Sequence, residues 1–211
     1  MQAKAPTKMK VLVVDDHPVV RVGISTIIDT QPDMTVVAET GSGEEAISLF
    51  REYVPDLTVM DLRLEHMSGV ACIRKIRKEF PEARFVVLTT YRGDEDIHQA
   101  LEAGASGYLI KGMPRQLLLD ALRRVYQGER FLPPMITEVL ASHKPEAELS
   151  VRERQVLSLL ASGKCNKEIA TALGIAEVTV KCHLSMIFLR LGVTDRTQAI
   201  IVAAQRGLVR L

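Results

Sequence analysis

Short apolar runs alternate with helix-like segments over the first 127 residues. The runs cover residues 11–14, 35–38, 57–60, 85–88 and 108–110. Each run is too short for a helix and is rich in residues that suit a buried strand. Between the runs, apolar side chains recur at helical spacing, as at Ile97, Ala100, Leu101 and Gly104, and again at Leu118, Ala121, Leu122 and Val125. Five strands alternating with five helices predict an α/β domain: a doubly wound, five-stranded parallel sheet of the flavodoxin-like type.

The pattern changes after residue 127. Residues 128–148 contain Pro133, Pro134 and Pro145 around a short helix-capable piece, which indicates a linker. From residue 149 the apolar spacing is helical only, and four glycines separate four short helices: Gly163, Gly174, Gly192 and Gly207. We therefore expect an α/β domain over residues 9–127, a linker over 128–148 and an all-α four-helix domain over 149–211.

Charge is distributed unevenly between these regions. The chain has a net charge of +1, but residues 149–211 hold nine Lys and Arg against four Asp and Glu. A basic domain joined to an acidic one hints at nucleic-acid contact. The three cysteines form no CxxC pair, which argues against a disulfide framework or structural zinc site and suits a reducing compartment. Residues 1–10 lack the apolar core of a signal peptide, and no run is long enough for a membrane span. We expect a cytoplasmic protein with no membrane partner.

Polar residues follow four of the five predicted strands. Asp15 and Asp16 follow the first strand, Asp61 the third, Thr89 the fourth and Lys111 the fifth. Parallel strands end at one edge of a sheet, so these side chains should converge there. Two carboxylates about 4 Å apart repel by roughly 4 kcal/mol at an effective dielectric near 20, and a hard cation such as Mg²⁺ would relieve that repulsion. Asp61 could then act as a nucleophile toward a phosphoryl group, with Lys111 neutralising charge. Any one of these five residues alone is better explained as a helix cap or loop residue; all five together at strand ends favour a shared site.

The residues around these positions also carry a resemblance. Residues 13–18 (VVDDHP), 60–69 (MDLRLEHMSG), 87–91 (VLTTY) and 107–111 (GYLIK) resemble the receiver domain of bacterial two-component response regulators. The resemblance spans about residues 9–127. It implies that Asp61 accepts phosphate from a histidine kinase and that Mg²⁺ is held by Asp16, Asp61 and the backbone carbonyl of Arg63, with Asp15 acting through water. It further implies that Lys111 contacts the phosphate and that Thr89 and Tyr108 form a switch pair.

Two departures from the family pattern and one alternative accompany this resemblance. Leu64-Glu65 stands where Met-Pro is usual, and Lys111-Gly112 where Lys-Pro is common. Neither departure involves a proposed ligand, so we expect altered loop rigidity and unchanged chemistry. Tyr108 is also explained as an ordinary half-buried strand aromatic.

The C-terminal region predicts a helix-turn-helix. Asn166 is placed to cap a helix whose buried face is Ile169, Ala170 and Leu173, and Gly174 then ends it. A second helix runs from Glu177, with an apolar stripe at Val180, Leu184, Ile187 and Leu191. Two short helices joined by a tight turn are typical of this motif, whose second helix enters the major groove. Any helical hairpin shows the same stripe, so spacing alone does not decide the matter.

Residues 149–157, 163–170, 179–184 and 191–199 add a resemblance to the LuxR-type helix-turn-helix, and with the receiver the chain resembles the NarL/FixJ class of response regulators. By that resemblance Lys181, Cys182 and Ser185 face bases, while Lys167, Thr179 and His183 lie nearer phosphates. The last helix would dimerise through Ile200, Ala203 and Ala204, a stripe that is equally explained as core. Ala176 replaces a usual capping serine, which costs about 0.5–2 kcal/mol, and Cys165 replaces another serine.

We expect a transcription regulator that is not an enzyme: phosphorylation of Asp61 by a cognate sensor histidine kinase promotes homodimerisation and binding to double-stranded promoter DNA. The sequence argues against three alternatives. A haloacid-dehalogenase phosphatase needs a second acid two residues after its nucleophile, and that position is Arg63. A LuxR-type sensor of a small molecule needs a ligand pocket, of which a chain with no Trp and 4% aromatic residues gives little sign. The same fold without phosphorylation is opposed by the complete set of acidic, Thr89 and Lys111 positions.

Overall fold

A computed structural model describes residues 8–90, 93–142 and 149–209 of the chain. These residues group into two compact units, one comprising residues 8–90 and 97–137 and the other residues 93–96, 138–142 and 149–209. The first seven residues and part of the expected linker, residues 143–148, lie outside the described residues.

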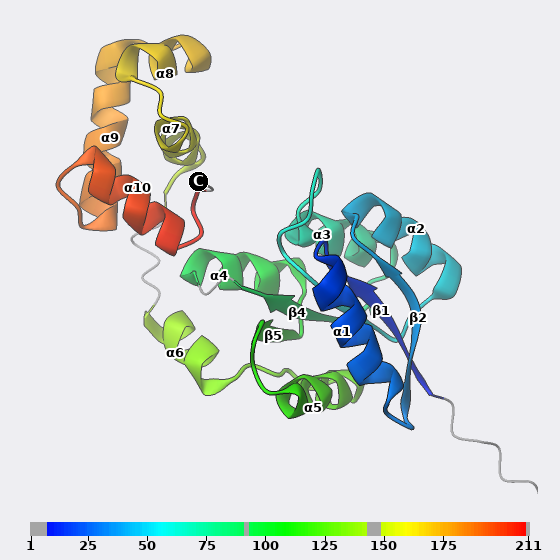
Figure 1. Cartoon of the computed structure of the whole chain (residues 1–211). Coiled ribbons are helices and arrows are strands. Elements are labelled where there is room, and N and C mark those ends of the chain that lie inside the picture. Colours follow the sequence, from blue (N-terminus) through cyan, green and yellow to red (C-terminus); the bar gives the residue numbers. More distant parts are fainter. Residues whose placement is uncertain (1–7, 91–92, 143–148, 210–211) are drawn as a thin grey trace, which may run out of the picture. The chain divides into compact units, whose positions relative to one another are not determined.

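The first unit is built on a five-stranded sheet in the order β2-β1-β3-β4-β5, in which every pair is parallel (Figure 1). The strands are β1 (Met9–Val14), β2 (Met34–Thr40), β3 (Leu57–Met60), β4 (Phe85–Thr89) and β5 (Gly107–Ile110). The helices between and after them are α1 (Pro18–Asp29), α2 (Gly43–Tyr53), α3 (Gly69–Glu79), α4 (Asp94–Ala103) and α5 (Arg115–Tyr126). The predicted doubly wound parallel sheet is confirmed.

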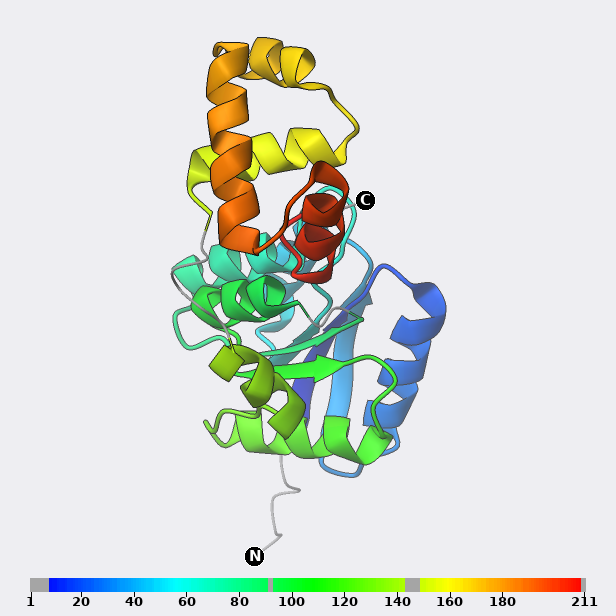
Figure 2. The same cartoon turned by 90° about the vertical axis from the view of Figure 1, so that its left-hand side faces the viewer.

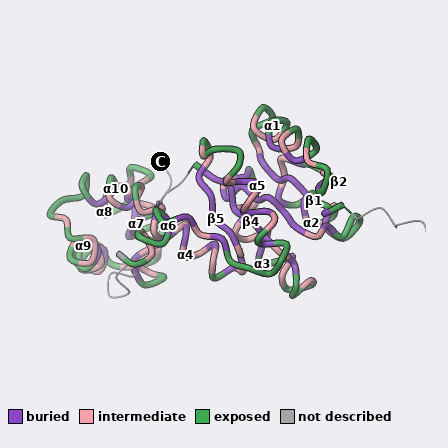
Figure 3. Tube along the Cα trace, turned by 90° about the horizontal axis from the view of Figure 1, so that it is seen from below, coloured by how far each residue is buried: buried purple, intermediate pink, exposed green. Residues whose placement is uncertain are grey.

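Helices cover both faces of this sheet (Figures 1 and 2). On one face, α1 and α5 pack against alternate strand residues such as Val11, Val13 and Val59. On the other lie α2, α3 and α4, and the Phe50 ring of α2 stacks on Phe85 of β4 at 6.3 Å between centroids. Figure 3 shows the strands mainly as buried chain and the helices with exposed outer sides. Burial on both faces explains why the strands read as continuous apolar runs.

Of the two helical stripes predicted from the sequence, the one in α5 is complete and the one in α4 is not. In α5 the whole predicted stripe is buried: Leu118, Ala121, Leu122 and Val125. In α4 the helix ends at Ala103, so the expectation that Gly104 belongs to its stripe is wrong. Gly104 has φ +109°, a conformation that ends a helix and that glycine adopts without a steric penalty.

The segment after α5 packs partly on the sheet. Phe131 forms a parallel bridge with Gly107, and its side chain is buried in the same core as β5 and α5. A further helix, α6 (Pro134–Ser142), begins at the second of two adjacent prolines, where a missing N–H costs nothing. Ile136 of this helix is fully buried.

The second unit contains four helices in a row, α7 (Val151–Ala161), α8 (Asn166–Leu173), α9 (Glu177–Leu191) and α10 (Arg196–Gln205). Its four predicted glycines all have positive φ, and each follows a helix or its last turn. The cap of α8 differs from the expectation: Cys165 is the N-cap and Asn166 the first helical residue. The Cys165 backbone N–H donates to the Glu168 carboxylate at 2.7 Å, which satisfies one of the unpaired N–H groups at the N-terminus of α8.

The core of this unit confirms the predicted apolar stripes. Ile169 and Ala170 of α8 and Val180, Leu184 and Ile187 of α9 are buried in one cluster with residues of α7. Among the described helices, none alone has the length and apolarity to cross a bilayer; α8 and α9, bent by 107°, meet that criterion only as a pair, by length and composition.

Candidate functional site

The strand register brings the aspartates of β1 and β3 together. Val14 pairs with Met60, and the Asp61 N–H continues the ladder by donating to the Val14 carbonyl at 2.9 Å. On the other side of β1, the Asp15 N–H donates to Thr40 at 3.0 Å. Asp15 and Asp61 are 1% and 3% exposed, so two carboxylates lie buried at the carboxyl edge of the sheet.

Lys111 reaches the same point from the end of β5. Its backbone N–H donates to the Thr89 carbonyl at 2.7 Å, which fixes the Lys111 backbone beside the end of β4. Its ammonium lies 2.7 Å from Asp15 Oδ2 and 2.6 Å from Asp61 Oδ2. Burial lowers the pKa of Lys111, but hydrogen bonds to Asp15 and Asp61 outweigh that effect, so the pKa is raised overall. The lysine therefore stays charged between two buried carboxylates.

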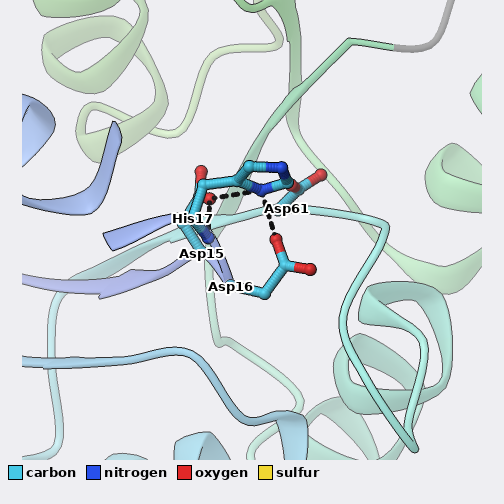
Figure 4. Close-up of side chains that lie close together, drawn as sticks. All are labelled: Asp15, Asp16, His17 and Asp61. Atoms are coloured by element: carbon cyan, nitrogen blue, oxygen red, sulfur yellow. Dashed lines mark hydrogen bonds and ion pairs between the residues drawn. The ribbon is translucent and has the colours of Figure 1, made fainter. Parts of the chain in front are cut away.

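Asp16 completes the acidic cluster (Figure 4), and its side chain is 26% exposed. Ligand atoms of Asp15, Asp16, His17 and Asp61 all lie within 4.8 Å of one another. His17 Nδ1 lies 2.5 Å from Asp16 Oδ1, and the His17 backbone N–H donates to Asp15 Oδ1 at 2.9 Å. This acidic pocket, with carboxylates on two adjacent strands, is compatible with a bound Mg²⁺ ion.

The loop after Asp61 folds back tightly on it. The Arg63 backbone N–H donates to Asp61 Oδ1 at 3.3 Å, which places the Arg63 peptide beside the cluster. Gly69 packs so closely that an added Cβ would meet the Asp61 carbonyl oxygen at 2.0 Å, so this position requires glycine. Leu64, one of the residues that depart from the family pattern, is buried at 5% exposure and so anchors this loop.

The backbone at Gly112 explains the second departure. Gly112 has φ +91°, whereas proline is restricted to about −65°. The chain therefore leaves Lys111 along a path that a Lys-Pro sequence cannot follow.

Thr89 and Tyr108 are both fully buried, on neighbouring strands. Thr89 pairs with Ile110, and Tyr108 pairs with Val87. The alternative explanation of Tyr108 as a half-buried strand aromatic does not fit, since its exposure is 0%. The Thr89 hydroxyl has no hydrogen-bond partner within the described part of the chain, which is unusual for a buried polar group and costs about 1–3 kcal/mol.

The sequence did not predict two of the residues in or beside the cluster. His17 belongs to the segment at residues 13–18, but its contact with Asp16 was not predicted. Arg21, one turn into α1, donates from its guanidinium to the Asp15 carbonyl at 2.6 Å. The signal available was position: Arg21 lies in the first turns of the helix that directly follows the Asp15-Asp16-His17 segment.

In the second unit, the predicted DNA-contacting residues lie on the exposed side of α8 and α9. Lys167, Lys181, Cys182 and Ser185 are exposed, whereas Thr179 and His183 are half-buried. Ala176 is the N-cap of α9 and makes no side-chain cap, as expected from its sequence. Two basic residues that the sequence reasoning did not select, Lys164 and Arg196, are adjacent, since the Arg196 guanidinium donates to the Lys164 carbonyl at 3.2 Å.

The stripe expected to dimerise α10 is part of the core. Ala203 is fully buried, and Ile200 and Ala204 pack against the same cluster. The large apolar side chain that α10 exposes is Ile201, at 50%. The core explanation thus holds for that stripe, because helical spacing turns Ala203 inward and Ile201 outward.

Comparisons with known proteins agree with both units. The response regulator receiver domain family matches residues 11–123, and the bacterial regulatory proteins, luxR family, match residues 147–203. The chain is similar to the response regulator protein VraR of Staphylococcus epidermidis, at 41% identity over 96% of this chain and 99% of the relative. VraR of Staphylococcus aureus is 42% identical over the same shares.

Solved structures show the same likeness. The response regulator ChrA of a heme-sensing two-component system matches with a TM-score of 0.57 and 38% identity, over 95% of this chain and 98% of that one. A structure of two RcsB dimers bound to two parallel DNAs matches with a TM-score of 0.69 and 25% identity, over 94% and 99%. The chain belongs to the two-component response regulators that join a receiver domain to a LuxR-type DNA-binding domain, and is thus a DNA-binding transcription regulator and not an enzyme.

Proposed function

We propose that Asp61 is the phosphoacceptor and that a cognate sensor histidine kinase is the donor. The observation that carries this proposal is the Asp61 carboxylate, 3% exposed and 2.6 Å from the Lys111 ammonium. In the transfer, a carboxylate oxygen bonds to phosphorus, the phosphorus–nitrogen bond of the kinase phosphohistidine breaks, and the imidazole takes up a proton. Lys111 neutralises charge that develops on the phosphoryl oxygens.

The acidic cluster fits Mg²⁺ as the cofactor, because its carboxylates are the oxygen donors that this ion prefers. Asp16, Asp61 and the Arg63 backbone carbonyl would hold the ion directly, with Asp15 acting through water. The ion supplies positive charge beside the phosphoryl group. The Arg63 N–H bond to Asp61 supports this assignment, since it keeps residue 63 next to the acceptor.

Thr89 and Tyr108 are proposed as the switch that reports phosphorylation. The Thr89 hydroxyl lacks a partner within the described residues, so a phosphoryl oxygen would satisfy it. A phosphoryl group adds about −1.5 to −2 charge and three acceptor oxygens. Movement of Thr89 toward it would change the space beside Tyr108 on β5.

We propose that the output is promoter binding by a homodimer, formed on phosphorylation or on DNA, in the cytoplasm. Lys181, Cys182 and Ser185 of α9 would face bases, and Lys167, Thr179 and His183 would lie near phosphates. The proposed domain boundaries are residues 9–127 for the receiver, 128–148 for the linker and 149–211 for the DNA-binding domain.

The test couples phosphorylation to DNA binding in the full-length protein. Acetyl phosphate and Mg²⁺ supply the phosphoryl group, and affinity is measured for a duplex selected from a random library. Wild type should bind roughly 5- to 150-fold more tightly after treatment, the usual range of allosteric coupling. Asp61→Asn should not respond, whereas Asp56→Asn, a matched change at a half-buried carboxylate that accepts from the Lys10 N–H, should respond fully. A response retained by Asp61→Asn, or absent from wild type, would contradict the proposal.

A further inference from the structure

The outward face of α9 is unexpectedly apolar. Opposite the buried Val180, Leu184 and Ile187, three large apolar side chains are exposed: Val178 at 66%, Met186 at 43% and Leu189 at 73%. Cys182 and Ser185 are exposed between them. Positions 178, 182, 185 or 186, and 189 are three or four residues apart, so these side chains form one stripe along the helix.

This face offers few groups for hydrogen-bond readout. Within α9, all of which is described, there is no Asn or Gln, and Arg190 lies 3.5 Å from the buried Glu153. The Ser185 hydroxyl donates to the Lys181 carbonyl at 3.1 Å, so its proton is already engaged. Arg and Lys read guanine, and Asn and Gln read adenine, through paired hydrogen bonds. Lys181 is the cation that remains for this purpose, and its ammonium is 3.4 Å from Glu177.

We infer that Val178, Cys182 and Leu189 recognise thymine methyl groups in the major groove, so that specificity depends on where the site carries thymine. The inference rests on the proposed function, since it deepens the DNA contact of α9. A thymine C5 methyl is the apolar group that base edges present in the major groove, and apolar side chains contact it. An apolar stripe on a recognition helix therefore matches thymine better than any other base.

Charge on the same unit favours DNA over an apolar protein surface as the occupant. Residues 149–211 carry nine Lys and Arg against four Asp and Glu. Arg196 lies against Lys164, and exposed Lys167 follows in the first turn of α8. Cations of this kind suit the phosphates that flank a major groove. An apolar stripe accompanied by positive charge matches duplex DNA in both respects.

The expected size of the effect follows from the burial of one methyl group. Removing a buried methyl should weaken binding about fourfold, which corresponds to about 0.8 kcal/mol. Deoxyuridine removes that methyl from thymidine and leaves base pairing unchanged, so it isolates the contact.

The experiment uses the full-length protein, treated with acetyl phosphate and Mg²⁺, and a duplex selected from a random library. Each thymidine of the selected site is replaced in turn by deoxyuridine, and dissociation constants are measured for wild type, Val178→Ala and Leu189→Ala. Val151→Ala is the matched control, because Val151 is 77% exposed in the same unit but belongs to α7. Wild type and Val151→Ala should lose about fourfold in affinity at particular positions. Each α9 variant should lose that sensitivity at one of those positions.

The outcomes separate this inference from the function on which it rests. A selected site that binds more tightly than random duplex, yet tolerates deoxyuridine at every position, would overturn the thymine inference and leave DNA recognition intact. Deoxyuridine sensitivity that persists at every position in both α9 variants would also overturn it, because Val178 and Leu189 would then contact none of the methyl groups that are read. Failure to select any duplex would contradict the proposed function, and the inference with it.

Discussion

The strongest stability prediction concerns Lys111. In Lys111→Met, the two carboxylates of Asp15 and Asp61 lose the ammonium that lies 2.7 and 2.6 Å from them, and they remain 2% and 4% exposed at their side chains. Two unit charges about 2.6 Å apart attract by roughly 6 kcal/mol at an effective dielectric near 20, before desolvation is subtracted. Since removal of one partner from a buried ion pair costs about 3–5 kcal/mol, we expect the receiver to lose stability of that order.

Urea denaturation, followed by circular dichroism in EDTA, measures this loss. Mg²⁺ should restore more stability to Lys111→Met than to wild type, because the ion then supplies the missing positive charge. Lys10→Met, at an exposed lysine of β1, is the control and should change stability by less than about 0.5 kcal/mol. Equal stability of Lys111→Met and wild type in EDTA would refute the reasoning.

The same ion pair predicts an alkaline limit for the receiver. The pKa of Lys111 is raised above the ordinary 10.5, because its hydrogen bonds to Asp15 and Asp61 outweigh the cost of burial. A group with a raised pKa contributes stability that is complete below the unfolded pKa and is lost as pH rises through the folded value. Wild type should therefore destabilise above pH 10.5 by an amount that Lys111→Met does not show.

Three further predictions concern other parts of the chain. Glu153→Gln should destabilise the DNA-binding domain by roughly 1.5–3 kcal/mol in urea titrations, because it removes a charged partner of Arg190. Burial raises the pKa of Glu153, but its hydrogen bonds to Ser150 outweigh burial and the pKa is lowered overall, so this contribution should be complete above pH 4.5 and vanish on acidification. Equal stability of wild type and variant at pH 7 would disprove it. Ala176→Ser should raise the thermal midpoint of that domain through a gain of about 0.5–2 kcal/mol from an added N-cap, and no gain would count against the cap. Burial raises the pKa of the Cys72 thiol to about 12, so native protein should react with a thiol reagent at its two exposed cysteines only, and a third fast-reacting thiol would contradict this.

Much of the fold was accessible from the sequence because its strands are buried on both faces. The run at residues 57–60 coincides with β3, and apolar spacing located the inner faces of α5 and α9. The positions at which elements end were harder to predict. Gly104 was assigned to the α4 stripe and Asn166 to a cap, because a local pattern does not reveal which residue takes the φ value that ends a helix or which backbone N–H is already bonded.

The candidate site was likewise predicted only in part. Strand topology predicted that Asp15, Asp61 and Lys111 would meet, since parallel strands end at one edge. It did not predict Arg21, whose bond to the Asp15 carbonyl depends on where α1 starts. Nor did it predict that Tyr108 is fully buried, since strand alternation does not say what covers each face.

The identity of the phosphorylated residue tests the account most directly. Full-length wild type and Asp61→Asn are incubated with acetyl phosphate and Mg²⁺, and intact-mass spectrometry with peptide mapping locates any added phosphoryl group. We expect wild type to gain one phosphoryl group, on the peptide that contains Asp61, and to gain none in EDTA or as Asp61→Asn. A phosphoryl group on another residue, or an equal gain by Asp61→Asn, would show that the buried carboxylate beside Lys111 is not the acceptor.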